Sequence, residues 1–283
     1  MVGPLVSPAE LAALESNLDA ALTLVDCRFS LADASAGERS YEEGHIPGAV
    51  YAHLERDMSG PIVPGKTGRH PLPEAEELAK RLGALGIGNG SLVVTYDESN
   101  GAFASRLWWL LRWLGHDDVA VLDGGLARWS AEGRPVTNAR TTLVAKEFRA
   151  TPRPELVADV NAVEAARRDP AARLLDARGA DRFRGENETM DPVAGHIPGA
   201  RSLPFLENLV DGRMRPAADL RARFEQALGG VPTDKAVMYC GSGVTACQNL
   251  LAAEHAGLSG MRLFPGSWSE WITDPSRPVA LGR

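Results

Sequence analysis

Short apolar runs alternate with amphipathic stretches along the whole chain. Apolar, often β-branched residues predict buried strands at residues 22–25, 92–96, 119–122, 174–175, 236–239 and 261–264. Helical periodicity predicts helices at residues 74–85, 102–114, 159–168, 217–228 and 244–256. Strands that alternate with helices favour an α/β fold in which helices flank a mostly parallel sheet. Ligands of such sheets bind outside the carboxyl ends of the strands.

The chain also repeats itself. The hexapeptide Gly-His-Ile-Pro-Gly-Ala occurs at residues 44–49 and again at 195–200, and further matches keep the same order. They pair residues 24–28 with 174–178, Tyr96 with Tyr239, and Trp129 with Trp271. Such order indicates a tandem duplication of one α/β unit. We therefore expect domains at residues 1–133 and 155–283, joined by a proline-containing linker at 134–154.

Composition and charge exclude several classes of protein. The 283 residues fit about two domains, and 30 basic against 37 acidic residues give a net charge of −7. Without a run of basic residues, we expect neither a nucleic acid nor a membrane as partner. The start of the chain has a helix-capping pattern, Ser7 followed by Glu10, rather than the pattern of a signal peptide. Three cysteines are too few for a disulfide framework, so we expect a reducing cytoplasm.

Cys240 stands between a predicted strand and a predicted helix. Gly241 and Gly243 let the backbone curl, so that amides of the loop can point at one centre, the cysteine sulfur. The amides concerned are those of Gly241, Ser242, Gly243, Val244 and Thr245. Thiols in such surroundings ionise more readily than free cysteine, so we expect a nucleophilic thiolate. The alternative is a buried, inert cysteine, which is the role we expect for Cys27 and Cys247.

The first half of the chain lacks this nucleophile. Asp97 stands where the second half has Cys240, in a longer and acidic loop at residues 97–101. We therefore expect the first domain to be catalytically silent. Side chains that recur in the silent half are expected to be structural, namely His45, His196, Arg28 and Arg178. The spacing of the histidines and cysteines predicts no metal site, and no cofactor is expected.

Three segments resemble the tandem-domain rhodanese-type sulfurtransferases. They are the paired hexapeptides, the block from Asp123 to Trp129, and the loop from Cys240 to Ala246. The resemblance implies two rhodanese-like domains, with an active cysteine in the second that cycles between thiolate and persulfide. Thiosulfate-type members usually carry Cys-Arg-Lys-Gly-Val-Thr in this loop. The mercaptopyruvate-type sequence Cys-Gly-Ser-Gly-Val-Thr is the one that stands here.

Charge favours the same subgroup. Two cations beside the sulfur would each stabilise a dianionic donor by up to ~3 kcal/mol, at about 6 Å and an effective dielectric constant of about 20. Gly241 and Ser242 supply neither charge, and neutral donors suit monoanionic 3-mercaptopyruvate, whose carbonyl becomes an enolate. We therefore expect sulfur transfer from 3-mercaptopyruvate through a Cys240 persulfide to cyanide or a thiol, with release of pyruvate. The thiol would be a small molecule or a thioredoxin-like protein.

Other functions remain as alternatives. One is thiosulfate sulfurtransferase activity, and a more remote one is a non-catalytic rhodanese-like binding module. A phosphatase of the Cys-x5-Arg type is disfavoured, because Ala246 occupies the position of its arginine.

The resemblance also implies further site residues. Arg182 matches the substrate-binding arginine, although a surface ion pair with Asp181 or Glu186 is its alternative role. The second family arginine, nine residues later, is replaced by Asp191, so a second cation is missing or comes from elsewhere. His70 matches an active-site histidine, and Glu55 stands where the family has an aspartate. With Ser242 they would form a proton relay, unless they are a surface glutamate and a loop histidine.

Overall fold

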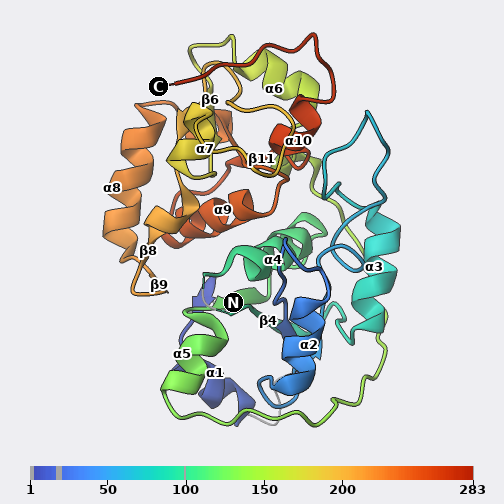
Figure 1. Ribbon diagram of the computed structural model, residues 1–283. Helices are drawn as coiled ribbons and strands as arrows, with labels where there is room; N and C mark the ends of the chain where they lie inside the picture. Colours follow the sequence, from blue (N-terminus) through green and yellow to red (C-terminus); the bar gives the residue numbers. More distant parts are fainter. Residues whose placement is uncertain (1–2, 17–20, 99, 283) are drawn as a thin grey trace. The chain divides into compact units, whose positions relative to one another are not determined.

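The structure, a computed structural model, describes residues 3–16, 21–98 and 100–282 and contains two compact units (Figure 1). The first comprises Met1–Gly60, Pro73–Arg153 and Asp211–Arg213, and the second Pro61–Leu72, Pro154–Val210 and Met214–Arg283. Segment Pro61–Leu72 therefore comes from the first half of the chain but folds with the second unit. Ser99, which belongs to the acidic loop of the first half, lies outside the described residues.

The first unit is built on a five-stranded sheet in the order β1-β5-β4-β2-β3, and its described strands all pair in parallel. Its strands are β1 (Leu5–Val6), β2 (Leu22–Asp26), β3 (Val50–Tyr51), β4 (Leu92–Tyr96) and β5 (Val119–Leu122). Its helices are α1 (Pro8–Glu15), α2 (Ala36–Glu43), α3 (Ala75–Ala84), α4 (Ala102–Trp113) and α5 (Gly125–Ala131). Helix α1 begins with the predicted capping box, in which Ser7 and Glu10 bond each other's backbone N–H.

The second unit repeats this plan with a four-stranded parallel sheet in the order β11-β10-β6-β7. Its strands are β6 (Arg173–Asp176), β7 (Arg201–Ser202), β10 (Ala236–Tyr239) and β11 (Arg262–Leu263). Its helices are α6 (Val160–Ala166), α7 (Ala180–Arg184), α8 (Ala217–Leu228), α9 (Thr245–His255) and α10 (Ser267–Trp271). Short 3-10 helices lie at Pro154–Leu156, Phe205–Asn208 and Thr233–Lys235, and β8 (Leu209–Val210) pairs with β9 (Arg213–Met214). The predicted α/β fold with parallel sheets is confirmed.

The duplication extends to single hydrogen bonds. In the first unit the Tyr96 hydroxyl accepts the backbone N–H of Ile46 at 3.2 Å. In the second unit the Tyr239 hydroxyl accepts the N–H of Ile197, also at 3.2 Å. Both tyrosines are fully buried in the apolar cores of their units. The repeated tyrosine thus joins the central strand of each sheet to the repeated hexapeptide.

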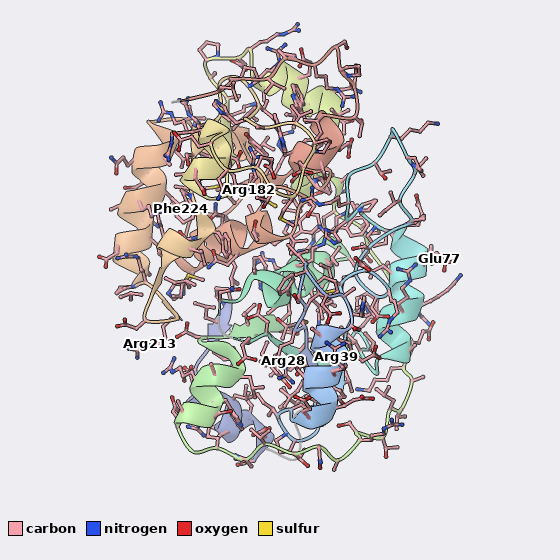
Figure 2. The ribbon with its side chains drawn as sticks, viewed as in Figure 1. Arg28, Arg39, Glu77, Arg182, Arg213 and Phe224 are labelled. Atoms are coloured by element: carbon pink, nitrogen blue, oxygen red, sulfur yellow. The ribbon has the colours of Figure 1, made fainter. Side chains whose placement is uncertain are left out.

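The repeated charged side chains are structural, as predicted. Arg28 forms a buried ion pair with Asp26 at 2.7 Å, and Arg178 pairs in the same way with Asp176 at 2.6 Å. Figure 2 shows Arg28 within the first unit. The repeated histidines each bond a main-chain carbonyl through Nδ1 at 2.7 Å, His45 that of Tyr41 and His196 that of Phe183.

The segment predicted as a linker runs along the first unit without helix or strand. Its Thr137 pairs with His45, the N–H of Lys146 donates to the Gly83 carbonyl at 2.9 Å, and Phe148 is buried. Within the described residues, no helix combines the length and the apolar character needed to cross a membrane.

Candidate active site

Cys240 lies at the carboxyl end of β10, which is flanked by β6 and β11 within the sheet. Its sulfur accepts the backbone N–H of Gly243 at 3.2 Å, and the Ser267 hydroxyl lies 4.0 Å away. The backbone N–H of Cys240 donates to that same hydroxyl at 3.0 Å, which fixes the residue at the strand end. The proton of the Ser267 hydroxyl is better placed on the carbonyl of Phe264, at 2.9 Å, so the Gly243 N–H is the close donor to the sulfur among the described residues. Ser267 was not predicted, because nothing in its sequence context distinguishes it.

Gly243 allows the loop to approach its neighbours this closely. It has φ of +78°, and a β-carbon at this position would lie 2.2 Å from the carbonyl oxygen of Pro265. Any other residue would therefore be strained twice, by its backbone conformation and by collision with a main-chain atom. The loop can therefore adopt its predicted curl because residue 243 is a glycine.

His70 and Ser242, two predicted site residues, form a hydrogen-bonded pair. Nδ1 of His70 lies 2.8 Å from the Ser242 hydroxyl, and both side chains are buried. Segment Pro61–Leu72 brings His70 to the cysteine loop, because this segment folds with the second unit. Glu55 belongs to the first unit, where its side chain is exposed and its N–H donates to Nδ1 of His53. Its predicted part in a relay stays a prediction.

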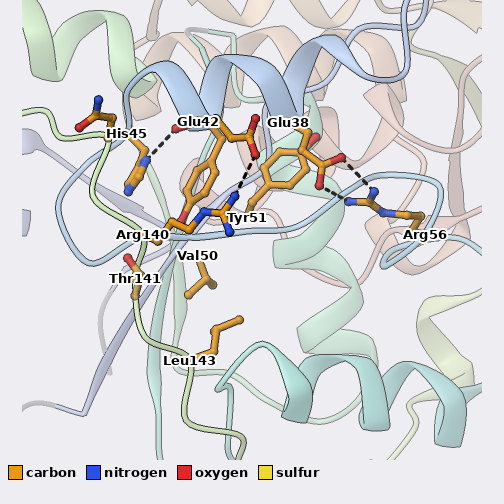
Figure 3. A pocket seen from close by; sticks show the side chains of 11 residues that line it. Glu38, Glu42, His45, Val50, Tyr51, Arg56, Arg140, Thr141 and Leu143 are labelled. Carbon is orange, nitrogen blue, oxygen red and sulfur yellow. Dashed lines mark hydrogen bonds and ion pairs between the residues drawn. The ribbon is translucent and has the colours of Figure 1, made fainter.

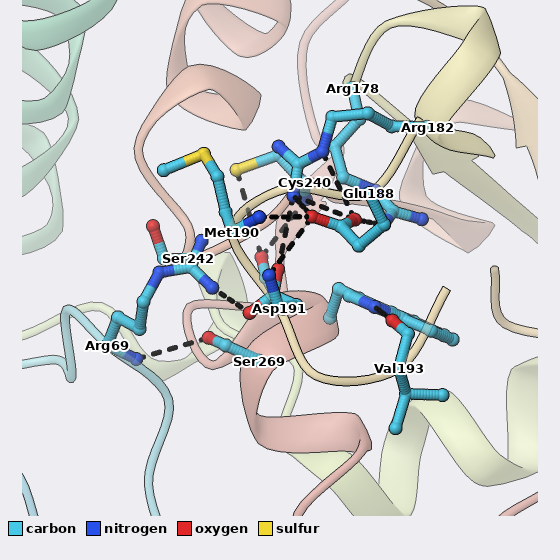
Figure 4. A network of polar contacts seen from close by, with 12 residues as sticks. Arg69, Arg178, Arg182, Glu188, Met190, Asp191, Val193, Cys240, Ser242 and Ser269 are labelled. Atoms are coloured by element: carbon cyan, nitrogen blue, oxygen red, sulfur yellow. Dashed lines mark hydrogen bonds and ion pairs between the residues drawn. The ribbon is translucent and has the colours of Figure 1, made fainter. Parts of the chain in front are cut away.

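Arg182, on α7, is paired with two carboxylates (Figure 4). Its guanidinium donates to Glu188 at 2.7 Å and to Asp191 at 3.1 Å. Its alternative role was a surface ion pair with Asp181 or Glu186. Glu186 pairs with Arg184 instead, and Arg182 donates its backbone N–H to the Asp181 carboxylate. Both carboxylate partners of Arg182 are almost fully buried, with side chains 3% exposed, whereas Arg182 itself is 19% exposed.

Arg69 is a further site residue that the sequence analysis did not predict. Its guanidinium forms an ion pair with Asp191, and its backbone N–H donates to the Ser269 hydroxyl at 3.1 Å (Figure 4). A β-carbon on Gly241 would lie 2.9 Å from one Arg69 nitrogen and 3.6 Å from one Arg182 nitrogen. Two guanidinium groups therefore flank the residue that follows Cys240. The only signal for Arg69 was its position next to the predicted His70.

The charges of this cluster balance. Its members are the cations Arg69, Arg178 and Arg182 and the anions Asp176, Glu188 and Asp191. Glu188 lies 3.5 Å from Arg178 as well as bonding Arg182, so it links the structural ion pair to the site. Burial lowers the pKa of the Arg69 guanidinium, since desolvation disfavours its charge. The loop itself carries no cation, as its sequence indicates, and Arg69 is a second cation that comes from outside the loop.

The equivalent loop of the first unit holds its own carboxylate. Asp97 accepts the backbone N–H groups of Gly101 at 2.9 Å, Phe103 at 3.0 Å and Ala104 at 3.3 Å. Burial raises the pKa of this carboxyl. The Asp97 carboxylate therefore takes three amide donors in the first unit, whereas the Cys240 sulfur in the second unit accepts the amide of Gly243.

A pocket of about 570 Å³ in the first unit contains none of the predicted site residues (Figure 3). Its charged side chains pair with one another, Arg56 with Glu38 at 3.0 Å and Arg140 with Glu42 at 3.7 Å. These ion pairs offset the positive charge that an anionic substrate would need, so we do not place the chemistry there.

Comparison with known proteins decides the family. The model of the rhodanese-like domain matches residues 7–132 and 159–274. The chain belongs to the rhodanese family. It is 53% identical, over 98% of both chains, to a protein of Pseudomonas aeruginosa named "Probable 3-mercaptopyruvate sulfurtransferase". The predicted pair of rhodanese domains and the predicted sulfurtransferase class are both confirmed.

Two further rhodanese relatives extend this comparison. A thiosulfate/3-mercaptopyruvate sulfurtransferase of Arabidopsis thaliana is 34% identical, over 94% of this chain and 84% of its own. The crystal structure of SseA from Escherichia coli, described as a 3-mercaptopyruvate sulfotransferase, matches with a TM-score of 0.81 and 34% identity. That match covers 95% of this chain and all of the other. A sulfur donor and a thiol acceptor fit this family.

Proposed function

We propose that this rhodanese transfers the sulfur of 3-mercaptopyruvate through a Cys240 persulfide to a thiol or cyanide, releasing pyruvate. One observation carries the proposal: the loop that follows Cys240 is bonded to His70 through Ser242 and flanked at Gly241 by two guanidinium groups. A nucleophile, a proton-handling pair and a carboxylate-binding pair are the three parts this reaction needs. The 53% identity to a relative named for this activity supports it.

The donor binds through its carboxylate. Arg182 and Arg69 present planar, permanently charged groups, which suit bidentate hydrogen bonds to a carboxylate. The Cys240 sulfur is buried, with a residue exposure of 1%, whereas the arginine side chains are 19% and 28% exposed. The donor therefore meets the arginines first and reaches the sulfur when neighbouring side chains shift.

The transfer step breaks one bond and forms another. The Cys240 thiolate attacks the sulfur of 3-mercaptopyruvate, an S–S bond forms, and the C–S bond breaks with its electron pair on carbon. The resulting pyruvate enolate is stabilised by the Ser242 hydroxyl and takes up the proton that the transferred sulfur carried, which His70 and Ser242 relay. Pyruvate leaves, and Cys240 holds an anionic persulfide that the loop amides stabilise, Gly243 first among them.

The second step regenerates the enzyme. A thiolate or cyanide attacks the outer sulfur, and the S–S bond breaks. Cys240 is released as its thiolate, and the product, a persulfide or thiocyanate, departs. A small thiol or a thioredoxin-like protein is the acceptor we propose. The three cysteines of the chain are free thiols, so we propose a reducing compartment, the cytoplasm, as its location.

Thiosulfate is the second candidate donor. Two guanidinium groups beside Gly241 supply positive charge that the loop lacks, and the Arabidopsis relative is named for both donors. We favour 3-mercaptopyruvate because Glu188 and Asp191 already offset the charge of those arginines. A non-catalytic binding module is the remaining alternative, and it predicts no thiocyanate from either donor with cyanide.

Mass spectrometry of the intact protein after incubation with 3-mercaptopyruvate tests the proposal. We expect one added sulfur atom on Cys240, its removal by cyanide, and no addition in Cys240→Ser. Cys247→Ser is the matched control, since Cys247 is a buried thiol in α9, and it should be labelled like the wild type. An unlabelled wild type, or a label on Cys247 alone, would refute the proposal.

A further inference from the structure

Asp191 lies between the two arginines that flank the cysteine loop. One carboxylate oxygen pairs with Arg69 and the other with Arg182, so a single buried side chain joins segment Pro61–Leu72 to α7 (Figure 4). Asp191 is also held in place from its own backbone. Its N–H donates to Glu188 at 3.0 Å, as does the N–H of Met190. The carboxylate is therefore fixed where both guanidinium groups meet.

We propose that Asp191 determines donor specificity by cancelling one positive charge at the carboxylate-binding pair, which favours monoanionic over dianionic sulfur donors. This inference rests on the proposed function, since it takes Arg69 and Arg182 as the groups that bind the donor. Asp191 acts through these arginines and is a positioning residue.

The two sulfur donors differ in charge. 3-Mercaptopyruvate brings one negative charge to the site and thiosulfate brings two. A fixed carboxylate at the same distance from both repels the dianion about twice as strongly as the monoanion. Burial strengthens this effect, because a side chain that is 3% exposed is poorly screened by water and salt. Removing the charge should therefore help thiosulfate more than 3-mercaptopyruvate.

Asp191 also explains why the cysteine loop can be uncharged although two arginines lie beside it. Without a β-carbon on Gly241, the Arg69 guanidinium occupies the space beside this residue. Because Arg69 lies outside the cysteine loop, its charge can be neutralised by Asp191, an acid that also lies outside this loop. The positive charge beside the sulfur is thus present but balanced, and Asp191 is the carboxylate that contacts both cations.

The test compares kcat/KM for thiosulfate and for 3-mercaptopyruvate, with cyanide as acceptor, in the wild type and in Asp191→Asn. We expect the ratio of thiosulfate to 3-mercaptopyruvate to rise about tenfold in the variant. A purely structural role would lower both values by a common factor and leave the ratio unchanged. Glu186→Gln is the matched control, because it removes an exposed carboxylate of the same loop that pairs with Arg184. Its ratio should equal that of the wild type.

A second variant keeps the test decisive if Asp191→Asn fails to fold. Arg69→Gln removes one of the two cations that pair with Asp191 and leaves the Asp191 charge in place. The kcat/KM ratio of thiosulfate to 3-mercaptopyruvate should therefore fall below that of the wild type. An unchanged ratio in the folded Asp191 variant, or a rise in Arg69→Gln, would overturn the inference. Failure of the proposed function has a different signature, namely a wild type that gains no sulfur from 3-mercaptopyruvate.

Discussion

Nδ1 of His70 lies 2.8 Å from the hydroxyl of Ser242, although the two residues come from opposite halves of the chain. Each is buried, so their hydrogen bond is shielded from water and couples the loop of Cys240 to segment Pro61–Leu72. Ser242 is two residues from the nucleophile in the sequence. The pair of His70 and Ser242 can therefore transfer a proton to the pyruvate enolate that forms beside Cys240.

Ser242→Ala should lower kcat for pyruvate release by about a hundredfold, the lower range of general acid–base catalysis. His70→Gln should do the same, and the double variant should be no slower than either single one, because the two residues act as a unit. Single-turnover release of pyruvate measures this step. Cyanolysis of enzyme already carrying the persulfide is the control and should stay near the wild-type rate. Losses that multiply in the double variant would show that the two residues act separately.

Arg182→Gln should raise KM for both donors by roughly ten- to a hundredfold, as expected for a lost hydrogen bond to a charged group of about 1.5–3 kcal/mol. Initial-rate kinetics with varied donor measures it. Arg184→Gln is the matched control on the same helix, because Arg184 pairs with the exposed Glu186. Equal effects of the two variants would contradict a role of Arg182 in donor binding.

Gly241→Ala should impair donor binding while leaving the fold intact. The new β-carbon would stand 2.9 Å from the end of the Arg69 side chain, which can move away because it is flexible. We expect KM for 3-mercaptopyruvate to rise about tenfold. The free energy of unfolding should fall by less than in Gly243→Ala, because the atom to be displaced is the end of a side chain rather than main chain. Gly243→Ala is the contrasting variant, since its β-carbon meets the Pro265 carbonyl and should destabilise the protein. An unaffected KM in Gly241→Ala would mean that Arg69 does not bind the donor.

Asp97 should give the first unit a measurable pH dependence of stability. Burial raises the pKa of this carboxyl in the folded state. Its contribution to stability is therefore fully present below the unfolded pKa of about 3.9 and is lost as the pH rises through the folded pKa. The stability of the wild type relative to Asp97→Asn should fall over that range in urea titrations.

Asp33→Asn is the control of opposite sign for this titration. Hydrogen bonds from Arg39 and Ser35 lower the pKa of Asp33 to about 2, so its contribution is present above the unfolded pKa and lost as the pH falls toward 2. The same slope in both variants would contradict the assignment to Asp97.

Strand β4 and helix α8 have the predicted bounds. Strand β4 is a mostly apolar run, and α8 buries Leu220, Phe224 and Leu228 at helical spacing. Helix α2 was not predicted, because only one of its eight residues is buried and no apolar face is present. Strands β3 and β7 have two residues each, and α7 has five, so in none of them does the period of a strand or of a helix repeat. These short elements depend on tertiary contacts that a local pattern does not contain.

The candidate site divides in the same way. Cys240 and Ser242 are neighbours in one loop, and a motif was enough to predict them. The ion pair between Arg69 and Asp191 joins residues far apart in the sequence, and only the fold of segment Pro61–Leu72 onto the second unit brings them together. Asp191 was noticed as a missing arginine, but a partner for it could not be inferred without that fold.

Segment Pro61–Leu72 also bears on the history of the duplication. A gene cut between the two halves would yield a product with the nucleophile but without the imidazole and one of the guanidinium groups. Under the proposed function, the first half is therefore required for catalysis even though it lacks a nucleophile, since it supplies segment Pro61–Leu72 to the second unit. The first half can thus do without a nucleophile of its own, but loss of the whole first half would also remove the segment that completes the proposed site.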